Sequence, residues 1–296
     1  MSVRMWRTMG AMAVVSGLVI AGCGSSDGSS STTTEGTGTT AGGAACAKDS
    51  LNLVTDGTLT IGTDTPAFPP WFVDDDPSNG KGFESAVAYA VADEMGFDAA
   101  DVTWTVAPFT NVIAPGAKDF DFDINQVSIS DERDQAVDFS SGYYDVNQAI
   151  VGFTDSAAAG ATTIADLQGL KLGAQVGTTS LDFINEVIAP DSEPLVYNDN
   201  SAAKAALDAK QVDAIVLDLP TAFYVSAVEI EGTAVIGQFE APAESPEQFG
   251  LVFEEGNPLR DCVNEAIARL TDSGTLADIE QEWLSDVVDA PVIGAG

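Results

Sequence analysis

Short β-branched runs alternate with helical stretches along most of this chain, and they do so in two successive series. The first series predicts a helix at 82–96 among strands at 59–63, 102–106 and 122–127. The second predicts helices at 180–188, 201–210 and from Pro220 onward, among strands at 171–176, 195–197 and 214–217. Such alternation favours parallel sheets with crossover helices, so the predicted fold is α/β. Two series within about 250 residues favour two Rossmann-like domains over one.

The N-terminus has the pattern of an export signal. Arg4 and Arg7 precede an apolar run at 9–20, which is too short to span a bilayer, and the run ends in Ile20-Ala21-Gly22-Cys23. An aliphatic residue and two small residues before a cysteine are typical of a lipobox, although an ordinary signal peptide with a chance cysteine is the alternative. Residues 1–22 are therefore predicted to be a signal peptide, and Cys23 is predicted to carry lipid. Residues 23–45 are rich in Ser, Thr and Gly and predict a flexible tether. We expect an extracytoplasmic protein that the lipid anchors to the cell membrane.

Two cysteines remain for the folded region. Cys46 opens it, and Cys262 lies in a helix predicted at 258–270, which a last helix at 276–283 follows. Outside the cytoplasm two such thiols are expected to pair, and two free thiols are the alternative. A disulfide would return the late helices to the first unit. It would divide the chain into lobe 1 (46–147 and 241–296) and lobe 2 (148–240), with two crossing strands as a hinge and a cleft between the lobes.

Charge and composition exclude several kinds of function. The chain has 46 acidic residues against 11 basic ones, a formal net charge of −35, so nucleic acid is not an expected partner. It has no histidine, which excludes Ser-His-Asp and Cys-His catalysis and the commonest zinc site. We therefore predict no catalytic residues, no metal and no cofactor.

Three segments predict a ligand site beyond the carboxyl ends of the strands. Arg133 is the only arginine between Arg7 and Arg260, and it ends the segment 128–133 that follows a predicted strand. A guanidinium can grip a carboxylate through two parallel hydrogen bonds, although pairing with a surface carboxylate is the alternative. The segment 173–180 runs from a strand through Gly177 into a helix N-terminus, where free amides attract an anion, with helix capping as the alternative. Asp218 follows the strand at 214–217 and would hold a cation, or it is a solvated strand end. Together the three segments are complementary to an α-amino acid zwitterion.

At this point the sequence resembles the bacterial extracellular solute-binding proteins of family 3. The resemblance runs from about Thr58 to Trp283, and its motifs are Gly62-Thr63-Asp64 with Phe68-Pro69-Pro70-Trp71, Gly82-Phe83, Ser128 to Arg133 with Val137-Asp138-Phe139-Ser140, Tyr143-Tyr144, Gly177-Thr178-Thr179, Val212 to Asp218, Phe249-Gly250-Leu251 and Gly256-Asn257-Pro258-Leu259. The family implies two lobes joined by a hinge, and a monomeric receptor that captures an amino acid for the permease of an ABC importer.

The resemblance also implies roles for single residues. Arg133 would bind the ligand α-carboxylate with Ser130 and the backbone amides of Thr178 and Thr179. Asp218 would bind the α-ammonium with the Ser128 carbonyl. Phe68 and Trp71 resemble the family's aromatic wall, with core packing as the alternative.

Some positions depart from the family pattern. Glu84 replaces the usual Asp, and Asn125 and Gln126 replace small or aliphatic residues. Asp64, Asn111 and Gln126 are candidates for reading the ligand side chain. A periplasmic enzyme, such as a dehydratase, is the alternative function, with Glu84 or Glu132 as its general acid. A sensor domain is disfavoured because no transmembrane or signalling segment follows Trp283.

Overall fold

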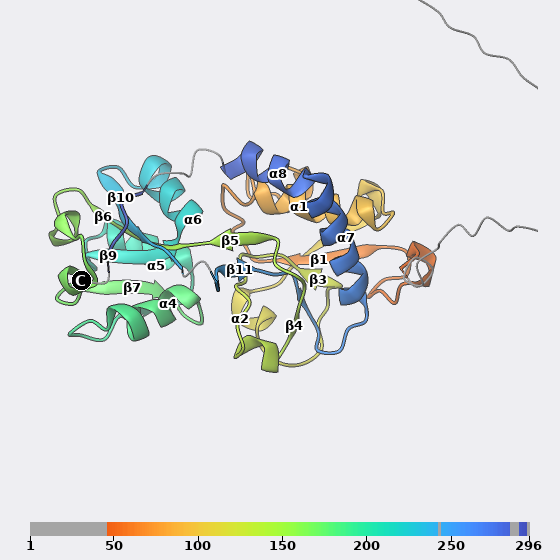
Figure 1. Cartoon of the computed structure of the whole chain (residues 1–296), viewed down its shortest axis with the longest axis horizontal. Coiled ribbons are helices and arrows are strands. Elements are labelled where there is room, and N and C mark those ends of the chain that lie inside the picture. Colours follow the sequence, from red (N-terminus) through yellow and green to blue (C-terminus); the bar gives the residue numbers. More distant parts are fainter. Residues whose placement is uncertain (1–45, 242–243, 285–289, 295–296) are drawn as a thin grey trace, which may run out of the picture. The chain divides into compact units, whose positions relative to one another are not determined.

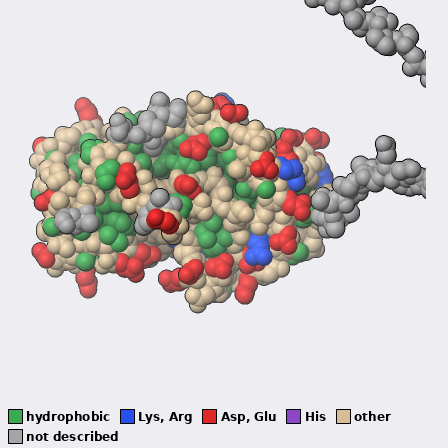
Figure 2. Space-filling model, in the orientation of Figure 1, with side chains coloured by type: hydrophobic (Ala, Val, Ile, Leu, Met, Phe, Trp, Pro, Cys, Tyr) green, Lys and Arg blue, Asp and Glu red, His purple; other side chains and the backbone are tan. Residues whose placement is uncertain are grey.

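The computed structural model of the protein describes residues 46–241, 244–284 and 290–294. The predicted signal peptide, Cys23 and the tether lie outside these residues. None of the helices in the described part combines the length and the apolar composition that crossing a bilayer requires. On the face shown in Figure 2, Asp and Glu side chains are widely spread and few Lys or Arg side chains are visible.

The first sheet has five strands in the order β2-β1-β3-β12-β4. Figure 1 labels β1, β3 and β4 of this sheet. Their bounds are Leu59–Thr63 for β1, Val102–Val106 for β2, Phe122–Asp123 for β3, Asp138–Phe139 for β4 and Val252–Phe253 for β12. β1 pairs in parallel with β2 and β3, whereas β12 runs antiparallel to β3 and β4. Every residue of β1 is buried, as expected of a central strand that helices cover on both faces.

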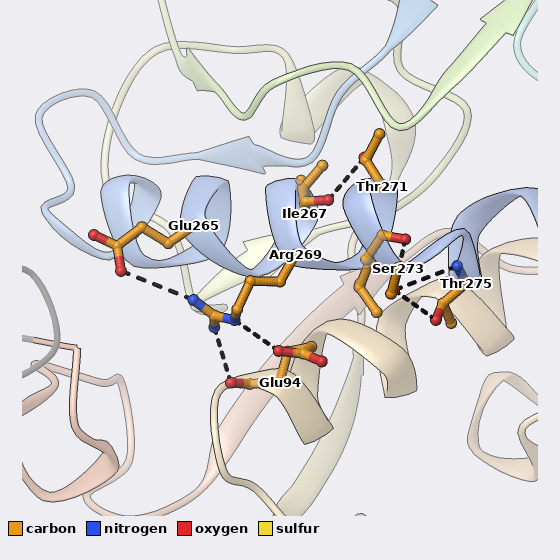
Figure 3. A network of polar contacts seen from close by, with 8 residues as sticks. Glu94, Glu265, Ile267, Arg269, Thr271, Ser273 and Thr275 are labelled. Carbon is orange, nitrogen blue, oxygen red and sulfur yellow. Dashed lines mark hydrogen bonds and ion pairs between the residues drawn. The ribbon is translucent and has the colours of Figure 1, made fainter. Parts of the chain in front are cut away.

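Two long helices pack side by side on this sheet. Phe83, Val87 and Val91 form a buried apolar face on α1 (Phe83–Glu94). The buried face of α7 (Leu259–Ser273) includes Val263, Ala266, Ile267 and Leu270. Arg269 of α7 also reaches α1, where its Nε donates to Glu94 Oε2 at 2.7 Å and its Nη2 to the Glu94 carbonyl at 3.0 Å (Figure 3). This pair is half-exposed, so it contributes little compared with the buried face. The short helix α2 (Phe109–Val112) and the last helix α8 (Thr275–Leu284) complete the first lobe.

The strand predicted at 122–127 ends early, at Asp123. Three residues later Gln126 has a φ of 48°, in the left-handed region that non-glycine residues rarely adopt. Its backbone N–H donates to the buried Glu84 Oε1 at 2.7 Å. The Gln126 amide thus bonds to a side chain rather than to a neighbouring strand.

The second sheet has the order β10-β6-β9-β7-β8. Its strands are β6 (Gln148–Phe153), β7 (Leu172–Gln175), β8 (Leu195–Tyr197), β9 (Ala214–Asp218) and β10 (Thr233–Phe239), and its helices are α3 (Ile164–Leu167), α4 (Thr179–Phe183), α5 (Asn200–Asp208) and α6 (Leu219–Tyr224). β7 is parallel to β8 and β9, but β6 is antiparallel to β9 and β10. Both sheets are therefore mixed rather than parallel, because β12 in the first sheet and β6 in the second run antiparallel to both of their neighbours.

Two paired strands carry the described chain between the two sheets. β5 (Tyr144–Val146) lies between β4 and β6 in the sequence, and β11 (Glu247–Phe249) lies between β10 and β12. These two strands pair antiparallel in a separate small sheet. The arrangement confirms the predicted two-lobed α/β fold with two crossing strands.

The two ends of the described chain are tied to different lobes. Cys46 and Cys262 form a disulfide with their Cα atoms 5.3 Å apart, which confirms the predicted pairing and attaches the entry segment to α7. Val292 bridges Gln238 of β10, and Gly294 bridges Thr163 before α3. These last residues thus lie on the second sheet, whereas the sequence assigned 241–296 as a whole to lobe 1.

Candidate functional site

Arg133 is buried, with 8% of its surface exposed, and begins a short 3-10 helix between β3 and β4. Its Nη1 donates to the Ser128 carbonyl at 2.6 Å, and its Nη2 donates to the Gly177 carbonyl in the second lobe at 2.9 Å. The ring of Phe109 lies 5.6 Å from the guanidinium carbon. Within the described residues no carboxylate forms an ion pair with Arg133, so the structure does not show the surface pairing that was the alternative.

Several carboxylates lie near Arg133, but none of those in the described residues forms an ion pair with it. Burial lowers the pKa of its guanidinium from the ordinary value, and the carboxylates of Asp182, Glu247 and Asp218 oppose that shift. Because these carboxylates lie nearby without contacting it, the guanidinium keeps donors available for an anion that enters the cleft.

The second lobe supplies the facing wall through the turn from β7 into α4. Gly177 has a φ of 73°, which favours glycine, and Thr178 then caps α4 by accepting a hydrogen bond from the Leu181 amide at 3.2 Å. The capping that was the alternative for this segment is therefore present. Thr179 lies half-buried beside it, with its hydroxyl 3.4 Å from that of Ser128.

Asp218 is the last residue of β9, which is parallel to β7, so it lies at the same edge of the second sheet as the turn from β7 into α4. Gln148 Nε2 donates to its Oδ1 at 2.9 Å. Burial, followed by the nearby carboxylate of Glu247, raises the pKa of Asp218 to about 8. A carboxyl group with so high a pKa is mostly protonated at pH 7. A cationic partner beside it lowers that pKa and so stabilises the ionised form.

Most of the predicted ligand-binding residues line one cleft. Asp64, Phe68, Gln126, Arg133, Thr178, Thr179 and Asp218 line it, together with Phe72, Phe109, Asn125, Gln175, Ser180, Asp199 and Asn200. The other predicted residues lie elsewhere: Ser128 is buried behind Arg133, Ser130 accepts a hydrogen bond from the Arg133 amide, and Asn111 lines a different hollow.

Trp71 and Phe68 have different surroundings. Trp71 is buried against Phe83 and Phe249, and its Nε1 donates to Thr221 Oγ1 of α6 at 2.8 Å. Phe68 is half-buried, and the Lys204 ammonium of α5 lies 3.7 Å from its ring centre. Trp71 thus packs in the core, whereas Phe68 lines the cleft. Both side chains contact the second lobe.

A second acidic cluster lies behind the first-lobe wall. Glu84 is fully buried and accepts hydrogen bonds from the Tyr143 hydroxyl at 2.5 Å and from the Gln126 side chain, and burial raises its pKa to about 7. Asp123 is also fully buried, and burial raises its pKa well above the usual range. Glu84, proposed as a general acid in the alternative function, does not line the cleft, and Glu132 is exposed outside it.

Sequence reasoning missed Glu247 and Gln148. Gln148 is the one polar side chain in the otherwise apolar strand β6, and a polar residue in an apolar run is a signal that the sequence does offer. Glu247 precedes the recognisable Phe249-Gly250-Leu251 motif by two residues, but nothing in the sequence connects it with Asp218.

Two α/β lobes with a polar cleft, a buried guanidinium on one wall and a carboxylate on the other define a solute-binding protein. The chain belongs to the bacterial extracellular solute-binding proteins, family 3, whose pattern it matches over residues 59–286. It is 30% identical to the L-cystine-binding protein TcyJ of Escherichia coli over 237 residues, which cover 79% of this chain and 85% of the relative.

Solved structures give the same result. An ancestral arginine-binding protein bound to arginine is 30% identical with a TM-score of 0.64, and the match covers 77% of this chain and 98% of that one. An ancestral amino acid-binding protein that is a precursor of cyclohexadienyl dehydratase is 28% identical with a TM-score of 0.63, over 77% and 95% of the two chains.

Proposed function

We propose that this protein captures an α-amino acid, or a related small zwitterion, in the cleft and delivers it to the permease of an ABC transporter. The observation that carries the proposal is that Arg133 and Asp218 come from different lobes and line the same cleft. A guanidinium complements the ligand carboxylate, and a half-buried carboxylate complements its ammonium. The similarity to proteins named for binding L-cystine and arginine supports this ligand class.

Each end of the zwitterion would be held by one of the two charges. Arg133 would bind the α-carboxylate with the amides of Thr178 and Thr179, and Ser130, outside the cleft lining, would assist through its hydrogen bond with the Arg133 amide. Asp218 would bind the α-ammonium with the Ser128 carbonyl, which has a second lone pair besides the one that accepts from Arg133. Phe68 would form the apolar wall, and Asp64 and Gln126 would face the ligand side chain. Trp71 would support this wall from the core.

Capture would occur by closure of the lobes about the β5–β11 connection. We propose that lobe 1 comprises 46–147 with the part of 241–296 that packs on the first sheet, and that lobe 2 comprises 148–240 with residues 290–294. A ligand that bridges Arg133 and Asp218 would hold the cleft shut. Closure excludes water, which strengthens both charge pairs.

We further propose an extracytoplasmic monomer that is tethered to the membrane through lipid on Cys23. The proposal is supported by the lipobox pattern and by the Ser/Thr/Gly-rich segment between Cys23 and the first lobe. The tether would keep the receptor near its permease.

We propose that the protein is not an enzyme. Glu84 has the raised pKa that a general acid needs, but it is fully buried and both its carboxylate oxygens accept hydrogen bonds. The similarity to a precursor of a dehydratase nevertheless makes turnover worth measuring.

A thermal-shift screen tests the proposed function. The protein should first be unfolded and refolded to remove any bound ligand, and then heated with each common amino acid. A ligand at 100 times its dissociation constant adds about 2.7 kcal/mol to stability, which corresponds to a rise in Tm of about 5 to 10 °C for a chain of this size.

The screen also ranks the ligands. The charged residues that line the cleft are Asp64, Asp199 and Asp218 against Arg133. We therefore expect cationic amino acids to give the largest shifts, and glutamate and aspartate the smallest. Mass spectrometry of each incubated ligand should show it unchanged. Failure of every amino acid to stabilise the protein would refute the proposal, and formation of a product would favour the enzyme.

A further inference from the structure

Glu247 lies at the start of β11, where the chain returns from the second lobe to the first. Its Oε1 accepts a hydrogen bond from the Ser128 hydroxyl at 2.6 Å, and Gln148 Nε2 donates to its Oε2 at 3.1 Å. Ser128 belongs to the first lobe, and Gln148 opens β6 of the second. Glu247 therefore contacts both lobes at their junction, behind the lining of the cleft.

Gln148 connects Glu247 to Asp218. The Nε2 atom that faces Glu247 also donates to Asp218 Oδ1 at 2.9 Å, while Gln148 Oε1 accepts from the Ser180 hydroxyl at 2.6 Å. The Gln148 side chain is buried, so a single amide group holds the carboxylates together in a place that water reaches poorly. Two carboxylates so close together repel each other when both are ionised.

The surrounding charges do not relieve this repulsion. The charged and titratable groups that act on the pair come from α1, β5, α4 and the loop after β3, and they are Glu84, Tyr143, Tyr144, Asp182 and Arg133. Arg133 is the one cation in that described set, and it makes no ion pair with either carboxylate. Burial and the charge of Glu247 raise the pKa of Asp218 to about 8.

We propose that Glu247 acts on the ammonium site from behind the cleft lining, and that its charge keeps a proton on the Asp218 carboxyl group until the ammonium of a ligand displaces that proton into solvent. The inference rests on the proposed function. Before binding, the pair carries one negative charge and one proton. After binding it carries two negative charges beside the ligand ammonium, which keeps its own protons, and the released proton passes to the buffer. Glu247 is a positioning residue, because it acts on the ligand through Gln148 and Asp218.

Calorimetry counts the released proton. Titrations of the full chain with the strongest amino acid from the screen, at pH 7 in phosphate and in Tris, give the number of protons released from the difference in binding enthalpy. We expect about 0.9 protons per ligand for the wild type, since a group with a pKa of about 8 is about nine-tenths protonated at pH 7.

The variant Glu247→Gln retains an oxygen for the Ser128 hydroxyl but removes the charge. It should lower the pKa of Asp218 by about one to two units, so that about 0.5 protons or fewer are released. Glu244→Gln is the matched control, because Glu244 is exposed on the same segment, and it should release as many protons as the wild type.

A purely structural role for Glu247 would change affinity without changing the proton count. Release of 0.9 protons by Glu247→Gln would therefore overturn the inference, as would a wild type that binds an amino acid without releasing protons. The second result would leave the proposed function intact, whereas absence of any amino-acid binding would refute both.

The wild-type pH profile tests the inference without a variant. Affinity should rise about tenfold per pH unit up to about pH 8 and then level off, and a flat profile would overturn the inference.

Discussion

Asp218→Asn isolates the charge that the account assigns to the ammonium site. Asparagine keeps the shape of the side chain and an oxygen that can accept the hydrogen bond from Gln148. Burial and the neighbouring Glu247 raise the pKa of Asp218 to about 8, so this side chain is mostly protonated in the ligand-free protein at pH 7. Asparagine resembles the protonated form. We therefore expect the Tm of the ligand-free protein at pH 7 to change little.

The expected loss of affinity depends on pH. Removing one partner of a buried charge pair costs on the order of 2 to 5 kcal/mol. The wild type must first ionise Asp218, which costs about 1.4 kcal/mol at pH 7 because the pKa lies one unit above the pH. The variant should therefore bind about 3-fold to 400-fold more weakly at pH 7. At pH 8.5 the ionisation cost is small, and the loss should reach about 30-fold to several thousand-fold.

Isothermal titration calorimetry with the strongest ligand from the screen, at both pH values, measures this difference. Wild-type affinity should rise from pH 7 to pH 8.5, whereas the affinity of the variant should stay nearly constant. Equal affinities of the two proteins at pH 8.5 would refute the reasoning, because Asp218 would then hold no positive charge of the ligand.

Three further changes test other parts of the account. Arg133→Lys keeps the charge but loses the two-pronged donor, so calorimetry should show affinity about 10-fold to 100-fold lower, and unchanged affinity would contradict the assigned grip. Burial raises the pKa of Glu84 to about 7, so its stabilising contribution is complete below its unfolded pKa near 4.5 and is lost as pH rises through 7. The Tm of the ligand-free protein should fall from pH 5 to pH 8, and Glu84→Gln should flatten that decline; parallel curves would refute the assignment. Cys23→Ala should move the protein from the membrane fraction to the supernatant without changing its affinity, and loss of binding would contradict a tether outside the fold.

The sequence was informative wherever local periodicity determined structure. The strand at Leu59–Thr63 and the buried face of α7 follow from patterns of two and of 3.6 residues. The Cys46–Cys262 pair followed from compartment and cysteine count, and it correctly returned α7 to the first lobe. Arg133 could be singled out because so few cations remain in the body of the chain.

The remaining features depend on contacts between distant segments. Periodicity at 122–127 predicted a longer strand, but the strand ends at Asp123, and the Gln126 amide donates to the side chain of Glu84. Two aromatics that flank a pair of prolines look alike in the sequence, and only the packing shows Trp71 in the core and Phe68 at the cleft. Glu247 meets Asp218 only because β11 and β9 converge on the side chain of Gln148, and no local pattern records that meeting.

In the proposed closed state a single ligand bridges Arg133 and Asp218. The most direct measurement compares the strongest amino acid from the screen with two analogues, one that lacks the α-ammonium and one that lacks the α-carboxylate, by calorimetry at pH 8.5. Each analogue leaves either Asp218 or Arg133 without a partner. The affinity of each should therefore be lower than that of the amino acid by a factor of about 30 or more. Equal binding of the analogue without an α-ammonium would contradict the account, because the ligand would then be a simple anion held by Arg133 alone.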